Sequence, residues 1–150
     1  MRSERFLLDA MLGKLATYLR MCGYDAAYAL DRGIEADDRL IAIAQAESRT
    51  VVTRDRSLAA SAPDSALLES RDVHEQLREL VDAGVDLTPA GTPTRCGRCN
   101  GHLEATPVAG STPAYAPDPD EADIWQCEDC GQYFWKGSHW DDVAQTLSEL

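Results

Sequence analysis

Four cysteines form two C-x-x-C pairs in the second half of this 150-residue sequence. The pairs, Cys96/Cys99 and Cys127/Cys130, are separated by 27 residues. Zinc binds four thiolates in a tetrahedron, and two such pairs supply that ligand set. Two disulfides would need an oxidising compartment, and a redox C-x-x-C pair would need a βαβ context. We therefore predict a structural zinc ion bound by these four cysteines, which leaves no open position for catalysis.

The other cysteine and the histidines have plainer interpretations. Cys22 falls on the apolar face of a predicted helix and is expected in the core. His102 and His139 lie near the cysteine pairs, but four thiolates already complete a tetrahedral site. His74 is expected on the surface.

Four aspartates form a second group whose positions favour chemistry. Asp9 and Asp55 each follow a predicted strand, and Asp37 and Asp38 begin a helix between these strands. At one edge of a parallel sheet these carboxylates would repel one another unless a cation held them. Magnesium and manganese take oxygen ligands, and they can activate water and stabilise phosphoryl oxygens. The spacing equally allows surface residues or helix caps, with Asp37 a good N-cap, and a receiver-like domain places acids similarly.

Two cations lie close to these aspartates in the sequence. Lys14 comes five residues after Asp9, in the first turn of a predicted helix, and Arg54 adjoins Asp55. Either side chain can hold a scissile phosphate. The alternative is a solvated helix face or an ion pair with a nearby aspartate.

The elements that must position these residues alternate between strand and helix. Apolar and β-branched runs predict strands, and apolar residues at helical spacing predict helices, one of them with a capping box at Asp72 and Glu75. The alternation implies right-handed βαβ crossovers and a parallel sheet of strand order 2-1-3-4. The expected strands are 6–8, 26–29, 50–53 and 66–68, and the expected helices are 12–22, 37–44 and 73–81.

A change of composition divides the chain. Residues 84–94 are rich in Gly, Pro and Thr, and residues 106–123 form a Pro- and acid-rich stretch expected to be a loop. We predict an α/β domain over residues 1–88, a linker at 89–94 and a zinc ribbon with a C-terminal tail over 95–150.

The net charge of −12 argues, by itself, against a nucleic-acid partner. However, twelve of the fourteen cations are Arg, and sixteen of the 26 acids are Asp. This composition is typical of adaptation to high salt, where repulsion is screened within about 3 Å. We interpret the charge as a halophilic environment. With no apolar stretch of membrane-spanning length and no signal peptide, we expect a soluble, cytoplasmic protein.

Several runs of residues together resemble a known family. They are LDAMLGKLA at 8–16, LRMCGYD at 19–25, Asp37-x-x-Leu40, Thr53-Arg54-Asp55, the two cysteine pairs with their flanks, and YFWKGSHW at 133–140. Nearly the whole chain is similar to the PIN-like ribonuclease family of the Mut-seven C-terminal type. The resemblance implies a PIN-like three-layer α/β domain, followed by a small zinc ribbon.

The resemblance also implies metal-dependent hydrolysis of RNA. Asp9, Asp37 and Asp55 would hold magnesium or manganese, with Asp38 a neighbour that cannot be separated from Asp37. Lys14 or Arg54 would steady the phosphate. The alternative is an inactive module that binds RNA or the ribosome, and a third interpretation is a scaffold for proteins alone.

The aromatic run at 135–140 has two interpretations. Its rings and its Lys can stack bases and touch phosphates, or its Trp residues can pack the ribbon against the first domain. The ribbon would accordingly position RNA or a protein partner, such as the ribosome.

Overall fold

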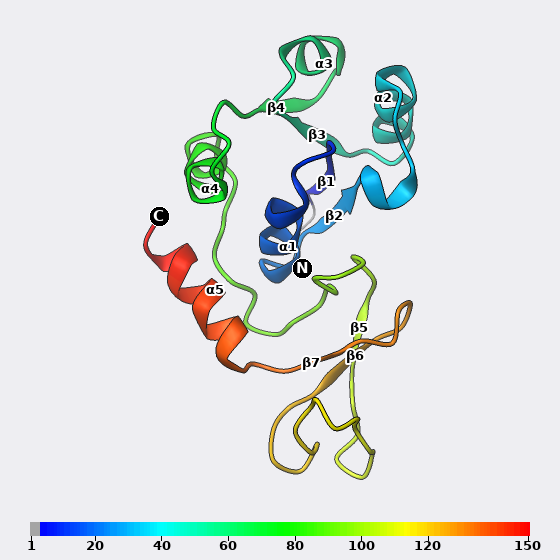
Figure 1. The fold of residues 1–150 in the computed structure, drawn as a ribbon, viewed down its shortest axis with the longest axis vertical. Coiled ribbons are helices and arrows are strands. Elements are labelled where there is room, and N and C mark those ends of the chain that lie inside the picture. Colours follow the sequence, from blue (N-terminus) through cyan, green and yellow to red (C-terminus); the bar gives the residue numbers. More distant parts are fainter. Residues whose placement is uncertain (1–3) are drawn as a thin grey trace.

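The computed structural model describes residues 4–150, and its central feature is a four-stranded parallel sheet (Figure 1). The strand order is β2-β1-β3-β4, which confirms the predicted order. All four predicted strands are confirmed. Three of them have bounds that differ from the predicted ones by one residue, and the strand at 50–53 has the predicted bounds. The strands are β1 (Arg5–Leu8), β2 (Asp25–Tyr28), β3 (Thr50–Thr53) and β4 (Ser65–Leu67).

Alternating side chains of the strands divide the core into two layers. Phe6 and Leu8 face one hydrophobic cluster, whereas Leu7 faces the other, because successive side chains of a strand point to opposite faces. The first cluster is covered by α1 (Gly13–Met21), α4 (Val73–Asp82) and α5 (Ser138–Ser148). The second is covered by α2 (Asp37–Ala46) and α3 (Arg56–Ser61). A short 3-10 helix, η1 (Leu30–Arg32), follows β2.

The starts of the helices test the capping predictions. Asp72 caps α4 and accepts from the Glu75 N–H at 3.2 Å, as predicted. The prediction that Asp37 caps its helix is wrong. Ala36 occupies the N-cap position of α2, no side chain makes a cap hydrogen bond there, and Asp37 is already helical. The short helix α3 was not predicted; Asp55 is its N-cap.

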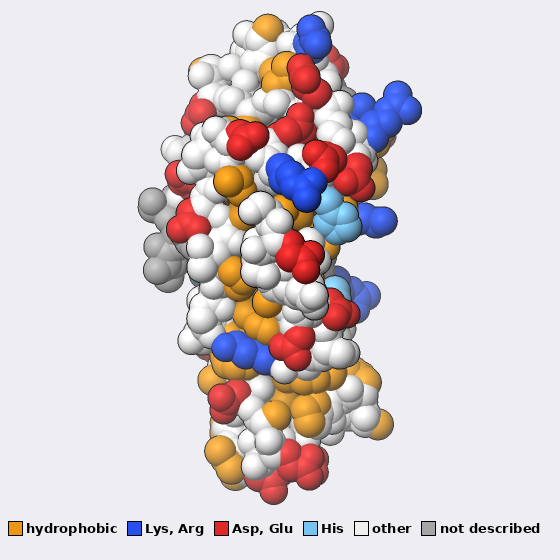
Figure 2. Space-filling model, turned by 90° about the vertical axis from the view of Figure 1, so that its left-hand side faces the viewer, with side chains coloured by type: hydrophobic (Ala, Val, Ile, Leu, Met, Phe, Trp, Pro, Cys, Tyr) orange, Lys and Arg blue, Asp and Glu red, His pale blue; other side chains and the backbone are white. Residues whose placement is uncertain are grey.

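The second half begins with a three-stranded antiparallel sheet of order β5-β6-β7. Its strands are β5 (Leu103–Ala105), β6 (Trp125–Cys127) and β7 (Tyr133–Phe134), and residues 106–124 form the predicted loop. We call residues 95–137 the ribbon, and residues 4–88 the sheet domain. Figure 2 shows acidic side chains spread over one face of the molecule, with hydrophobic ones gathered toward its lower end, where the ribbon lies.

The last helix returns to the sheet domain. Val143 and Leu147 of α5 are buried in the same cluster as Leu77 and Leu80 of α4. No helix was predicted over these residues, which were expected to form a C-terminal tail. Within residues 4–150, no helix is long and apolar enough to cross a membrane.

Candidate functional site

The four cysteines of the two C-x-x-C pairs lie together in the ribbon. Their Sγ atoms all lie within 4.8 Å of one another. Cys96 and Cys130 are 3.7 Å apart, and Cys99 and Cys127 are 3.5 Å apart. Zn–S bonds near 2.3 Å in a tetrahedron place Sγ atoms about 3.8 Å apart. The cluster can therefore bind a structural metal such as zinc.

The two C-x-x-C turns end with the same backbone conformation. Asn100, which follows Cys99, has φ +71°, and Gly131, which follows Cys130, has φ +78°. Glycine adopts this left-handed region freely, and asparagine is one of the few other residues that visits it routinely. The two turns are therefore equivalent in shape but differ in the side chain at this position.

Burial and backbone hydrogen bonds act in opposite directions on the thiols. Burial raises the pKa of Cys96. Burial also raises the pKa of Cys127, but hydrogen bonds from the N–H groups of Cys130 and Asp129, both 3.4 Å from its Sγ atom, outweigh that effect and lower it. Such bonds favour the thiolate form that binds metals.

The Asn100 side chain attaches the first C-x-x-C turn to the sheet domain. Its Nδ2 donates to Asp25 Oδ1 at 2.7 Å, and its Oδ1 accepts from the Ala26 N–H at 2.9 Å. In the same turn, Gly97 O accepts from Arg20 Nη1 at 3.0 Å. The first turn is thus held against β2 and α1 by side-chain hydrogen bonds.

Asp25 is the charged centre of this junction. Arg49, whose side chain is 3% exposed, pairs with Asp25 Oδ1 at 2.7 Å, and Arg95 lies 3.5 Å from Oδ2. Burial raises the pKa of Asp25, but hydrogen bonds from Arg49 and Asn100 hold it well below its usual range. Asp25 is therefore charged and shared between the two halves of the molecule.

A different edge of the sheet carries the predicted acids. Asp9 and Asp55 follow the carboxyl ends of the adjacent strands β1 and β3. Thr53 Oγ1 donates to Asp9 Oδ2 at 2.8 Å and accepts from the Asp55 N–H at 3.0 Å. Because Thr53 is fully buried, this bridge has a fixed position. Sequence reasoning missed the role of Thr53, although its place as the last residue of the strand was a usable signal.

The carboxylates at this edge have different local partners. Asp55 Oδ1 accepts from the N–H groups of Ser57 and Leu58, which start α3, while Oδ2 makes no hydrogen bond within the described chain. Asp37 and Asp38 lie exposed in the first turn of α2. Asp37 has no hydrogen-bond or ion-pair partner among residues 4–150.

The family of the chain agrees with the resemblance of its motifs. The Mut7-C RNAse domain family matches residues 4–147. The chain belongs to the Mut7-C RNAse domain family. No curated protein and no solved structure matches it. Membership indicates a ribonuclease-type function, with RNA as substrate or partner.

In this Mut7-C RNAse domain, the two predicted groups of metal ligands differ in spacing. Among the residues that the structure describes, only one group of three or more Cys, His, Asp or Glu side chains has all its ligand atoms within 4.8 Å of one another. That group is the four cysteines. Asp9, Asp37 and Asp55 therefore do not approach one another that closely.

The Mut7-C RNAse domain also has the two predicted cations near these acids in the chain. Lys14 is exposed in the first turn of α1, and Arg54 is half-buried between Thr53 and Asp55. The Nε atom of Arg54 is buried and has no hydrogen-bond partner among residues 4–150. A buried donor without a partner is costly.

Tyr28, which was not predicted to have a role here, contacts the loop between Asp9 and α1. Met11 has φ +79°, and its N–H donates to the Tyr28 hydroxyl at 3.3 Å. A Cβ added to Gly13 would lie 3.3 Å from the Tyr28 ring, so glycine allows the close approach of helix and ring.

Proposed function

We propose that the chain is a metal-dependent ribonuclease with a PIN-like fold, which hydrolyses RNA phosphodiester bonds where β1 and β3 end. The observation that carries the proposal is the bridge from Asp9 through Thr53 to Asp55. The bridge fixes the Asp9 carboxylate and the backbone of Asp55 at the carboxyl ends of adjacent parallel strands, the edge at which such sheets bind ligands. The ribonuclease family of the chain supports RNA as the substrate.

The donor set at this edge fits magnesium or manganese. Both ions prefer carboxylate oxygens, and the uncommitted oxygens of Asp37 and Asp55 are suited to one. We propose Asp9, Asp37 and Asp55 as the ligands, with Asp38 as the neighbour of Asp37. When bound, such an ion lowers the pKa of a water molecule and stabilises phosphoryl oxygens.

The side chains around the acids have separate tasks in this proposal. Thr53 holds Asp9 in one orientation through its hydroxyl group. The half-buried Arg54 donates from its guanidinium group to a phosphate oxygen and balances the negative charge of the phosphate. Lys14 offers a second, exposed cation. The cysteine-bound metal has no open position and is confined to holding the ribbon.

The test is cleavage of a labelled single-stranded RNA with manganese or magnesium. Asp9→Asn and Asp37→Asn should each reduce the rate by about 100-fold or more, because each removes a charged ligand. Cleavage by Asp38→Asn shows whether Asp38 has a role in the reaction apart from that of Asp37. Asp82→Asn, an exposed acid at the end of α4, is the matched control and should cleave like wild type.

Two outcomes would contradict the proposal. Cleavage at the wild-type rate by Asp9→Asn would remove Asp9 from the site. RNA binding without cleavage in either metal would identify an inactive RNA-binding module in place of a nuclease.

A further inference from the structure

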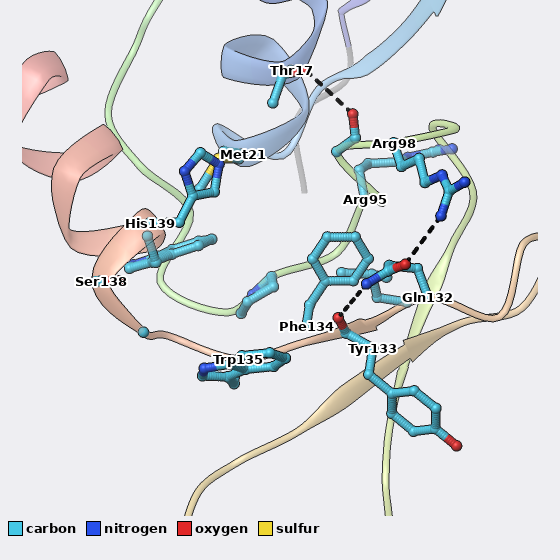
Figure 3. Close-up of a pocket in the computed structure, with 15 residues that line it drawn as sticks. Thr17, Met21, Arg95, Arg98, Gln132, Tyr133, Phe134, Trp135, Ser138 and His139 are labelled. Atoms are coloured by element: carbon cyan, nitrogen blue, oxygen red, sulfur yellow. Dashed lines mark hydrogen bonds between the residues drawn. The ribbon is translucent and has the colours of Figure 1, made fainter. Parts of the chain in front are cut away.

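A pocket of about 420 Å³ lies between α1, the ribbon and the start of α5 (Figure 3). Thr17 and Met21 of α1 form one side, and Phe134, Trp135 and Trp140 contribute aromatic rings. Figure 3 shows the Phe134 ring projecting into this space from β7. None of the proposed catalytic residues lines the pocket, so it is separate from the Asp9 edge.

The charge around this pocket differs from that of the rest of the chain. Of the 26 acids in the sequence, none lines it. Residues 89–150 contain ten acids and only three cations, Arg95, Arg98 and Lys136. Both arginines line the pocket, and Lys136 Nζ lies 5.6 Å from the ring centroid of Trp140, which also lines it. All three cations of this half are therefore collected around one aromatic cavity.

We propose that this pocket binds an unpaired nucleobase of single-stranded RNA. A base offers a flat π-face to the aromatic rings, and the phosphate beside it offers negative charge to the arginines. Bases in a duplex are already stacked and paired, so only an unpaired base can enter. The proposal rests on the proposed function, because the bound strand is the substrate of the Asp9 edge.

Arg98 is placed to contact the adjoining phosphate. It is exposed, and its Nη1 donates to Gln132 Oε1 at 3.2 Å, which orients the guanidinium and leaves its other N–H groups free for phosphate oxygens. Arg95 is more committed, because it donates to Asn100 O and pairs with Asp25. Arg98 is therefore the cation to test.

Helix α1 connects the pocket to the proposed catalytic edge. It begins four residues after Asp9 and passes the pocket at Thr17 and Met21. Nine helical residues span about 13 Å. A strand held by one base in the pocket can thus run along α1 to the carboxylates.

The experiment measures binding of a short labelled single-stranded RNA by fluorescence anisotropy, over a range of salt and without added divalent cation. Phe134→Leu should weaken binding about 5- to 150-fold, the loss of one base stack, with the salt dependence unchanged. Arg98→Gln should instead reduce the slope of log Kd against log salt by about one, the loss of one phosphate contact.

Matched variants separate these effects from changes in folding. Phe134→Tyr keeps the ring and should bind like wild type. Arg71→Gln removes another exposed cation, which does not line the pocket, and should leave the slope of log Kd against log salt unchanged. Zinc content and thermal unfolding of each variant report the state of the ribbon.

Three results would overturn the proposal. If both Phe134→Leu and Arg98→Gln bind RNA with the affinity and the salt dependence of the wild type, the pocket does not bind RNA. RNA cleavage by the wild-type protein would then still support the proposed nuclease. Equally tight binding of a duplex of the same sequence would exclude an unpaired base. A wild type that neither binds nor cleaves RNA would end both proposals and leave the apolar lining to a protein contact.

Discussion

The thiols and the carboxylates differ in how the fold prepares each group for a metal. The four Sγ atoms lie within 4.8 Å of one another, whereas the carboxylates of Asp9, Asp37 and Asp55 do not. The cysteines come in pairs on two short turns, so each turn sets the distance between its own two ligands. The aspartates come from three separate elements, and each carries a charge that repels the others.

The stability of the fold should depend on the cysteines more than on the aspartates. The first C-x-x-C turn is hydrogen-bonded to β2 and α1 through Asn100 and Gly97, so loss of the metal reaches the sheet domain. The carboxylates lie at an edge that Thr53 organises from within the strand. Changes at the cysteines should therefore cost stability, and changes at the aspartates should mainly cost activity.

The largest effect is expected from Cys96→Ser. It should reduce bound zinc from about one ion per chain to little or none, because structural zinc requires its full thiolate set. NMR signals of the ribbon should lose dispersion, while the sheet domain, which we propose to be a separate folding unit, keeps its dispersion except where α1 and β2 contact the first C-x-x-C turn. Elemental analysis and NMR spectra provide the measurement.

Cys22→Ala is the matched control for this prediction. Cys22 is fully buried in the core and lies outside the cysteine cluster, so its loss should lower the melting temperature but leave the zinc content unchanged. Wild-type protein purified without any zinc would contradict the assignment of the cluster.

Asp25→Asn should give the next largest effect, a loss of about 3 kcal/mol of unfolding free energy, because it removes the more buried of the two carboxylates that pair with the buried Arg49. The folded-state pKa of Asp25 is depressed, so its contribution is present above the unfolded pKa near 3.9 and is lost as pH falls below it. The gap between wild type and Asp25→Asn should therefore narrow in acid.

Chemical denaturation between pH 7 and pH 3 measures this gap. Glu47→Gln is the control, since Glu47 also pairs with Arg49 at 2.7 Å but is more exposed than Asp25. Exposed ion pairs contribute about 1 kcal/mol or less. A gap that widens toward low pH would contradict the role of Asp25.

The strand order and the cysteine cluster were predictable because their signals are local. Thr50–Thr53 is an unbroken β-branched strand, and each cysteine pair carries its own spacing. Alternation of strands and helices then restricted the sheet to few topologies. The predicted order 2-1-3-4 is confirmed on these grounds.

The parts that were not predicted depend on contacts distant in sequence. Helix α5 has an apolar face that gains a partner only when Val143 and Leu147 reach α4. Asn100 is conspicuous only once its partner Asp25 is known. Asp37 matched a capping pattern, but Ala36 occupies the N-cap position and Asp37 is the first helical residue. Boundaries of this kind follow from tertiary packing and not from single residues.

A smaller effect on stability should separate two roles of Asp55. Asp55→Ala removes the N-cap of α3 and should cost about 1 kcal/mol, whereas Asp55→Asn keeps an oxygen acceptor and should cost little. Both variants should lose cleavage if the charge of Asp55 serves the metal. Thermal unfolding and RNA cleavage, measured side by side, test this. An active Asp55→Asn would confine Asp55 to capping.

The smallest effect is expected from salt, and it acts on the carboxylates rather than the thiols. Raising potassium chloride from low to molar concentration shortens the screening length from about 10 Å to about 3 Å. The wild type, with a net charge of −12, should therefore melt at a higher temperature in molar salt. Asp9→Asn should stabilise the metal-free protein by a few tenths of a kcal/mol at low salt and by almost nothing at high salt.

Asp82→Asn removes the same charge from an exposed position and separates general from local repulsion. If Asp9, Asp37 and Asp55 repel one another, Asp9→Asn should stabilise the protein more than Asp82→Asn does at low salt. At high salt the two variants should have the same stability. A loss of about 1 kcal/mol in Asp9→Asn at every salt concentration would show instead that Asp9 is a structural acceptor for Thr53. A wild-type melting temperature that does not rise with salt would remove the halophilic interpretation, and the negative charge would then weigh against RNA as a partner.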